Sequence, residues 1–179
     1  KVLNNFINGT NLGTEAAIQI RMNTPTNFVP STFDQTIMFS AIIVENNHIN
    51  GVGHGYNIMG ARGTKIIGGD CRVTGGNVVR FFGDCDKNEI DGGYYETDGN
   101  GPINSAIVFG DAFLAPINFR NVKIRNATFV SGTASECWMR NVIPAVPNGF
   151  TLDNCDIHFL GTAGSGDFHK IFQFEQCTN

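Results

Sequence analysis

The sequence predicts an all-β protein, specifically a right-handed, single-stranded parallel β-helix (a β-solenoid). Three observations lead to this fold class. The 179 residues include 22 Gly, and only 16% are charged, well under the usual quarter. Gly and the abundant Asn tolerate left-handed backbone, which marks a chain that turns often. An imperfect repeat recurs along the chain, as it does in solenoids.

The repeat is a corner segment, in which an aliphatic residue is followed two positions later by Gly or Asn. The aliphatic side chain is expected to point inward, while the Gly or Asn turns the chain from one face into the next. We predict that the aliphatic residues stack in one interior column with the turning residues at successive corners. The aliphatic residues are Ile66, Ile90, Ile124 and Leu152, and the corners are Gly68, Gly92, Asn126 and Asn154. Weaker members begin at Leu3, Val44 and Ile49.

A second apolar run follows each corner segment and often ends in Gly. These runs cover residues 56–59, 77–82, 105–109, 137–139 and 170–174. Each coil therefore has at least two or three short strands, which pair in parallel with the next coil about 4.8 Å away. Right-handed winding follows the general chirality of parallel connections. Coils of roughly two dozen residues with variable loops fit a β-helix.

The chain is long enough for one domain with a sizeable core. We expect a single β-helix domain over residues 1–179, with a loop insertion at 23–36 and further loops at 98–104 and 161–167. Its ends look like cuts through a longer coil, so we expect a fragment without complete caps. A β-sandwich or jelly roll is the alternative, but two-residue hairpin signals are scarce.

Charge and cysteine usage narrow the class of partner. The net charge is −4 with no basic run, which argues against nucleic acid. The apolar stretches are short, so we expect no membrane span. The five cysteines include no CxxC pair, so we expect no zinc and no cofactor. Free thiols, with Cys71 and Cys155 buried, favour folding in a reducing compartment.

Asp84, Asp86 and Glu89 are expected on a solvated loop, with a calcium site as the less favoured alternative.

On these corner segments, over most of residues 43–179, the chain resembles the right-handed parallel β-helix superfamily. That superfamily includes pectate-lyase-like enzymes and phage tailspikes. Unpaired thiols and abundant Asn and Gly make the chain more similar to the tailspikes. The resemblance implies a homotrimer that binds and depolymerises bacterial surface polysaccharide. It also implies a place in the virion tail after folding in the host cytoplasm, a secreted protein being the alternative. Fold alone does not fix function.

The outward positions around each corner form columns with a mixture of aromatic and charged side chains. Such a mixture is suited to binding sugars. Aromatic side chains stack on the apolar faces of sugar rings, while carboxylates and Arg bind the sugar hydroxyls. The first column holds Asp70, Tyr94, Thr128 and Asp156; the second holds Arg72, Glu96, Val130 and His158; the third, before the corner, holds Ile67, Asp91, Arg125 and Asp153.

Asp70 and Glu96 are the leading catalytic pair, with Asp156 third. The pair lies one coil and two residues apart, which corresponds to about 8 Å. Inverting glycosidases separate their carboxylates by about 6.5–9.5 Å. The expected substrate-binding residues are Arg72, Tyr94, Asp91, Arg125 and His158. Three functions remain open for the chain. It can be a hydrolase or lyase, a non-catalytic carbohydrate-binding or adhesion module, or a structural trimeric shaft.

Overall fold

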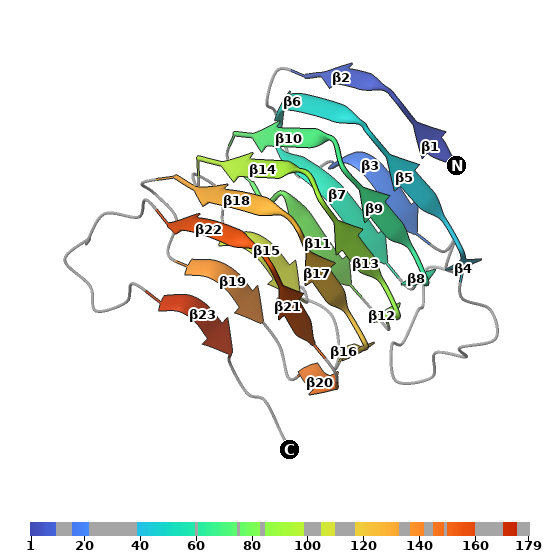
Figure 1. The fold of residues 1–179 in the computed structure, drawn as a ribbon, viewed down its shortest axis with the longest axis vertical. Helices are drawn as coiled ribbons and strands as arrows, with labels where there is room; N and C mark the ends of the chain where they lie inside the picture. The colour runs from blue at the N-terminus through green and yellow to red at the C-terminus, as the bar shows by residue number, and fades with distance from the viewer. Residues whose placement is uncertain are drawn as a thin grey trace, which may run out of the picture.

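The computed structural model is a parallel β-helix, which confirms the predicted fold class. It describes residues 1–9, 16–21, 39–59, 61–74, 76–82, 85–98, 105–109, 117–132, 137–141, 145–148, 150–159 and 170–174. These residues contain strands and no helix. Each coil contributes one strand to each of several parallel sheets, and the coils stack in sequence order from the N-terminal end to the C-terminal end (Figure 1). The predicted loops at 23–36 and 161–167 lie outside the described residues.

Three sheets have six strands and one has five. The first sheet contains β1 (Val2–Leu3), β5 (Ile43–Glu45), β9 (Lys65–Ile67), β13 (Glu89–Asp91), β17 (Lys123–Arg125) and β21 (Thr151–Asp153). The second contains β2 (Phe6–Asn8), β6 (His48–Val52), β10 (Asp70–Val73), β14 (Tyr94–Thr97), β18 (Thr128–Ser131) and β22 (Asp156–Phe159).

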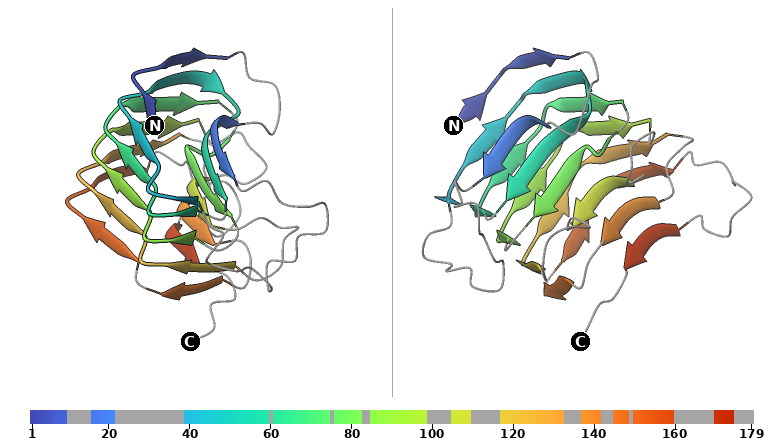
Figure 2. Two further views of the ribbon diagram at one scale, coloured as in Figure 1. Left: turned by 90° about the vertical axis from the view of Figure 1, so that its right-hand side faces the viewer. Right: turned by 180° about the vertical axis from the view of Figure 1, so that it is seen from behind.

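The other two sheets close each coil (Figure 2). The third contains β3 (Ala16–Arg21), β7 (His54–Met59), β11 (Val79–Phe82), β15 (Ser105–Phe109), β19 (Cys137–Asn141) and β23 (Lys170–Phe174). The fourth contains β4 (Phe39–Ser40), β8 (Ala61–Arg62), β12 (Cys85–Asp86), β16 (Ile117–Arg120) and β20 (Ala145–Asn148). The third sheet confirms the strands predicted from the second apolar runs.

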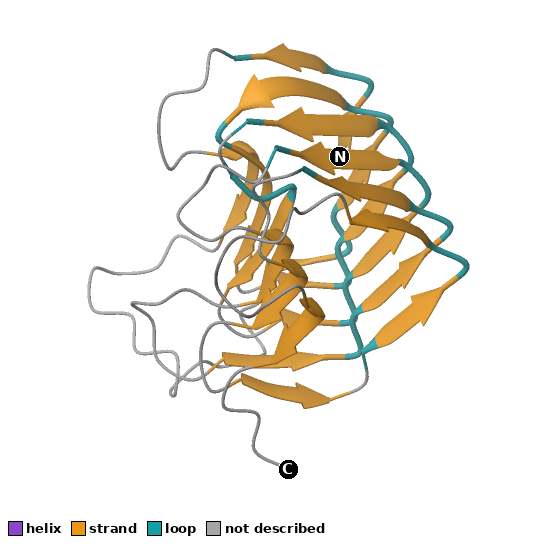
Figure 3. Ribbon diagram, turned by 90° about the vertical axis from the view of Figure 1, so that its left-hand side faces the viewer, coloured by secondary structure: helices purple, strands orange, loops and turns teal. Residues whose placement is uncertain are grey.

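The corner between the first and second sheets has the predicted conformation. Ile66 pairs with Ile90, Ile90 with Ile124, and Ile124 with Leu152. The first three are buried and Leu152 is half-buried. The corner residues all have positive φ, a conformation that Gly and Asn tolerate. They are Gly68 (57°), Gly92 (75°), Asn126 (54°) and Asn154 (50°). Figure 3 shows these short loops aligned from coil to coil.

Two of the weaker repeat members were predicted in the wrong register. Val44 pairs with Ile66 and belongs to the interior column, as expected, whereas Ile49 pairs with Cys71 in the second sheet. Val2, rather than Leu3, pairs with Val44. The Asn50-Gly51 pair imitates a corner in sequence, but Gly51 (φ 77°) lies within β6. The register between β6 and β10 shifts next to it, so this Gly accommodates a bulge rather than a corner.

The core is a set of interior columns that run through the coils. In the second sheet Ile49, Cys71, Tyr95 and Phe129 pair in turn and are all buried. The rings of Tyr95 and Phe129 are stacked, with centroids 5.0 Å apart. The Tyr95 hydroxyl donates to the carbonyl oxygen of Gly92 at 3.2 Å, so its polar end is satisfied.

Buried asparagines hold neighbouring coils together. The side-chain oxygen of Asn47 accepts from the backbone N–H of Asn5 at 3.0 Å, and its amide donates to the carbonyl oxygens of Val2 and Glu45. Asn88 plays the same part at the corner between β12 and β13, where its oxygen accepts from the N–H of Thr64 at 2.9 Å and its amide donates to the carbonyl oxygen of Ala61 at 2.9 Å. Hydrogen bonding on both sides of the amide makes its burial tolerable.

The acidic segment before Glu89 is structured, which corrects the predicted solvated loop. Asp86 lies in β12 and is buried. Its carboxylate bonds Nε of Arg62 at 3.3 Å and accepts from the side-chain amide of Asn121 at 3.1 Å. Glu89 lies in β13. A two-residue strand such as β12 is too short to show a period-two pattern, so the sequence does not reveal it; Asp84 lies outside the described residues.

The thiol predictions hold for Cys71 and only in part for Cys155. Both are free, and so is Cys85. Cys71 is buried, but Cys155 is half-buried, which corrects the expectation of full burial. Ala127 has the equivalent position one coil earlier and is buried, because the coil of Cys155 covers it. Cys155 lacks such cover, since among the described residues no strand of the first or second sheet stacks beyond β21 and β22.

Within the described part of the chain, no helix has the length and apolar character needed to cross a bilayer.

Candidate functional site

The outer face of the second sheet carries the predicted first and second columns. Parallel pairing places Asp70, Tyr94, Thr128 and Asp156 in one column. The neighbouring column holds Arg72, Glu96, Val130 and His158. Both columns begin two coils earlier than predicted. The added residues are Phe6 and His48 in the first column, and Asn8 and Asn50 in the second.

Arg72, Tyr94 and Glu96 form a cluster at the middle of this face. The Tyr94 hydroxyl donates to the Glu96 carboxylate at 3.1 Å, and Nε of Arg72 lies 3.4 Å from the same carboxylate. The guanidinium carbon of Arg72 is 5.4 Å from the centre of the Tyr94 ring, within cation–π range. Desolvation and the hydrogen bond to Glu96 raise the pKa of Tyr94. The phenol therefore keeps its proton and remains a hydrogen-bond donor.

Asp70 pairs with a residue that sequence analysis did not single out. Its carboxylate bonds Nδ1 of His48 on the neighbouring coil. On the other side of His48 lies the Phe6 ring, with centroids 4.7 Å apart and an interplanar angle of 14°. Phe6 is a large apolar side chain that is 79% exposed. These three residues occupy the same outward position on consecutive coils.

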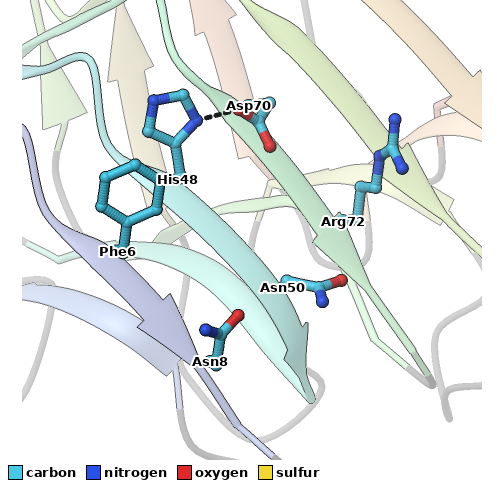
Figure 4. A pocket seen from close by; sticks show the side chains of 6 residues that line it. All are labelled: Phe6, Asn8, His48, Asn50, Asp70 and Arg72. Atoms are coloured by element: carbon cyan, nitrogen blue, oxygen red, sulfur yellow. Dashed lines mark hydrogen bonds and ion pairs between the residues drawn. The ribbon is translucent and has the colours of Figure 1, made fainter.

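A shallow hollow of about 270 Å³ lies over the first three coils (Figure 4). Two residues from each of β2, β6 and β10 line it, and all of them point outward. The two rings lie on one side, the two asparagine side chains on another, and the acid and the Arg lie on β10 (Figure 4). The lining residues are Phe6, Asn8, His48, Asn50, Asp70 and Arg72.

Other predicted site residues lie away from this hollow. Asp91 and Arg125 lie on the first sheet, around the corner, where Arg125 bonds Asp91 at 2.7 Å and Glu89 at 2.9 Å. The hydrogen bond from Asn126, together with Arg125, lowers the pKa of Asp91. These charges are thus engaged with one another. Asp156 and His158 are exposed on the second sheet, but three coils beyond Asp70.

Four residues that line the hollow were not identified from the sequence, although the sequence contains a signal for them. Phe6, Asn8, His48 and Asn50 alternate with inward residues, as strand residues should. Finding them requires alignment of the first two coils on Asn4 and Asn46, which both have positive φ. Among the described residues no group of three His, Cys, Asp or Glu side chains is arranged to hold a metal ion.

No protein-family model, curated protein or solved structure matches the chain. What the face does must therefore be inferred from its own chemistry.

Proposed function

We propose that the outer face of the second sheet binds a bacterial surface polysaccharide, in the manner of a phage tailspike. One observation carries this proposal. Rings, amides, a carboxylate and a guanidinium occupy matching outward positions on consecutive coils and surround a hollow. A polymer of sugars offers repeated apolar ring faces and hydroxyls, which these groups complement. The coils repeat about every 4.8 Å, so an extended glycan lying along the stack meets similar chemistry repeatedly.

A purely structural shaft has no need for such a face. Its outward positions would be expected to carry small polar side chains. Here Phe6 is 79% exposed, and Arg72 and Asn50 are also exposed beside it. An exposed ring beside amides and a guanidinium supplies both kinds of contact that a sugar needs, an apolar face and hydrogen-bonding groups. This contrast favours ligand binding over a scaffold role.

Depolymerisation by Asp70 and Glu96 is the second candidate function. Asp70 pairs with His48 and lies opposite Tyr94, while Glu96 pairs with Arg72. The backbone positions of these two acids are therefore one coil and two residues apart, about 8 Å, which is within the carboxylate spacing of about 6.5–9.5 Å in inverting glycosidases. One of them would act as general acid and the other as general base. This geometry suits inverting hydrolysis.

The test incubates the protein with purified capsular and O-antigen polysaccharides and measures both retention and new reducing ends. If the face binds and cleaves, Asp70→Asn and Glu96→Gln should each lower the cleavage rate by about 10²–10⁴-fold. Asp153→Asn, an exposed acid on the first sheet, is the matched control and should cleave like the parent. Retention of the polysaccharide without new reducing ends would show a binding module that does not cleave. If the protein neither retains nor cleaves any polysaccharide, the proposal is rejected.

A further inference from the structure

We propose that the hollow over the first three coils is a subsite for one neutral pyranose ring of the glycan, with Phe6 as its stacking face and the His48 ring packed behind it. This inference rests on the proposed function and deepens it. It assigns contact residues on β2 and β6, and it names the class of sugar.

The two rings are stacked on each other, so Phe6, which is 79% exposed, offers a sugar the ring face that His48 leaves uncovered. Phe6 and His48 are close to parallel, at 14°, with centroids 4.7 Å apart. They lie next to each other on the same side of the sheet (Figure 4). The Nδ1 atom of His48 is bonded to Asp70, which holds the imidazole in place. The apolar C–H face of a pyranose can cover the free face of Phe6, which carries no polar atom.

The opposite side of the hollow is polar. Asn8 and Asn50 lie two residues beyond the rings on the same two strands, and their backbones pair. Each amide offers donors and an acceptor. A sugar hydroxyl both donates and accepts, so it is matched by this pair. The free Phe6 face opposite two adjacent amides therefore fits a sugar that is apolar on its face and hydroxylated at its edge.

Local charge pairing favours a neutral sugar over an acidic one. Asp70 bonds His48, so its carboxylate already has a partner. Nε of Arg72 lies 3.4 Å from Glu96, and its guanidinium lies over the Tyr94 ring. The positive charge of Arg72 is thus balanced by the carboxylate of Glu96 on the next coil. A uronate or phosphate group would have to compete with Glu96 for Arg72.

The size of the hollow suits one ring. Its volume of about 270 Å³ is slightly below the roughly 300–1,000 Å³ of pockets that enclose a drug-sized ligand. A polymer would therefore place a single residue in the hollow and continue along the face. The next coil offers Tyr94, which pairs with Asp70 in the register of β10 and β14. The glycan would then run parallel to the stacking axis.

The test is binding to an array that carries neutral and uronate-containing bacterial polysaccharides. Phe6→Ala and Asn50→Ala should each weaken binding by at least tenfold, and Phe6→Tyr should retain it. Leu3→Ala is the matched control, because Leu3 is also exposed (39%) on the first coil but lies outside the hollow. Thermal unfolding of every variant should match the parent, since the replaced side chains are exposed.

The outcomes separate this subsite from the proposed function. Binding that is lost in Tyr94→Ala but unchanged in Phe6→Ala and Asn50→Ala overturns the subsite and leaves the binding face intact. Binding only to uronate-containing polysaccharides, with steep weakening by salt, overturns the neutral class. A parent protein that binds no polysaccharide on the array rejects both proposals.

Discussion

His54 is a buried histidine whose environment favours the neutral ring. Its Nδ1 atom accepts the backbone N–H of Asn77 at 3.0 Å. Desolvation by burial, with the nearby positive charge of Arg80, lowers the pKa of His54 from 6.5 to about 4. The unfolded chain therefore binds a proton between these pH values that the folded chain does not, and stability rises with pH across that window.

We predict that the free energy of unfolding falls by about 3 kcal/mol from this residue alone as the pH drops from 6.5 to 4. His54→Asn retains an acceptor for Asn77 and removes the titration, so its stability should depend less on pH. Urea unfolding over that pH range measures the slope. His158→Asn, at an exposed position, is the control. Equal slopes for the parent and His54→Asn would contradict the prediction.

The thiols differ in accessibility, and this should set their reactivity. Cys71 is buried, and desolvation together with the charge of Asp70 raises its pKa, so little thiolate forms. Cys155 is half-buried. Because thiolate and access both govern reaction, a native-state thiol reagent should modify Cys155 at least tenfold faster than Cys71. Peptide mapping by mass spectrometry follows each site, and equal rates would show that Cys71 is accessible.

At the scale of the element, the corner is the feature that the sequence predicts best. The corner requires a residue with positive φ. This is a local steric condition, and Gly and Asn meet it at little cost. Asn154 also donates to the side-chain oxygen of Asn126 at 2.9 Å, so adjacent corners bond to each other. The fourth sheet was not predicted, because several of its strands are too short to show a period.

The corner column predicts which replacements are tolerated at Gly92. Its φ is 75°, and an added Cβ would meet no atom closer than 3.8 Å. Asn occupies the same corner at positions 126 and 154 with positive φ. Gly92→Asn should therefore change the unfolding free energy by less than about 1 kcal/mol, whereas Gly92→Val should lose about 1–2 kcal/mol to backbone strain. Chemical denaturation measures both.

Gly69 is the contrasting control one position after the preceding corner. It also has positive φ, but a Cβ there would press against the carbonyl oxygen of Asn47. Gly69→Asn should thus be clearly more destabilising than Gly92→Asn. If the two variants unfold at the same denaturant concentration, backbone crowding does not govern these positions.

At the scale of the whole molecule, a homotrimer remains the prediction for assembly. Ile67 and Val130 are apolar residues at outward positions, on the first and second sheets respectively. Lateral association of three copies would remove these two side chains from water, which is favourable for apolar surface. Light scattering at micromolar concentration should report three times the chain mass of 19.4 kDa. Ile67→Asp should lower that mass and Ile67→Val should not, while a monomeric parent would reject the trimer for this chain.

The sequence by itself determined the parallel β-helix, the Ile66 column, its corners and the alternation of inward and outward residues. These follow from rules that act over a few residues: left-handed backbone at corners and a period of two in strands. Only the tertiary structure decided which coils align across loops of unequal length. It placed His48 against Asp70, 22 residues apart, and added Phe6 to the same column. Pairing between coils sets that register, and the local pattern reveals it only after the first two coils are aligned on Asn4 and Asn46.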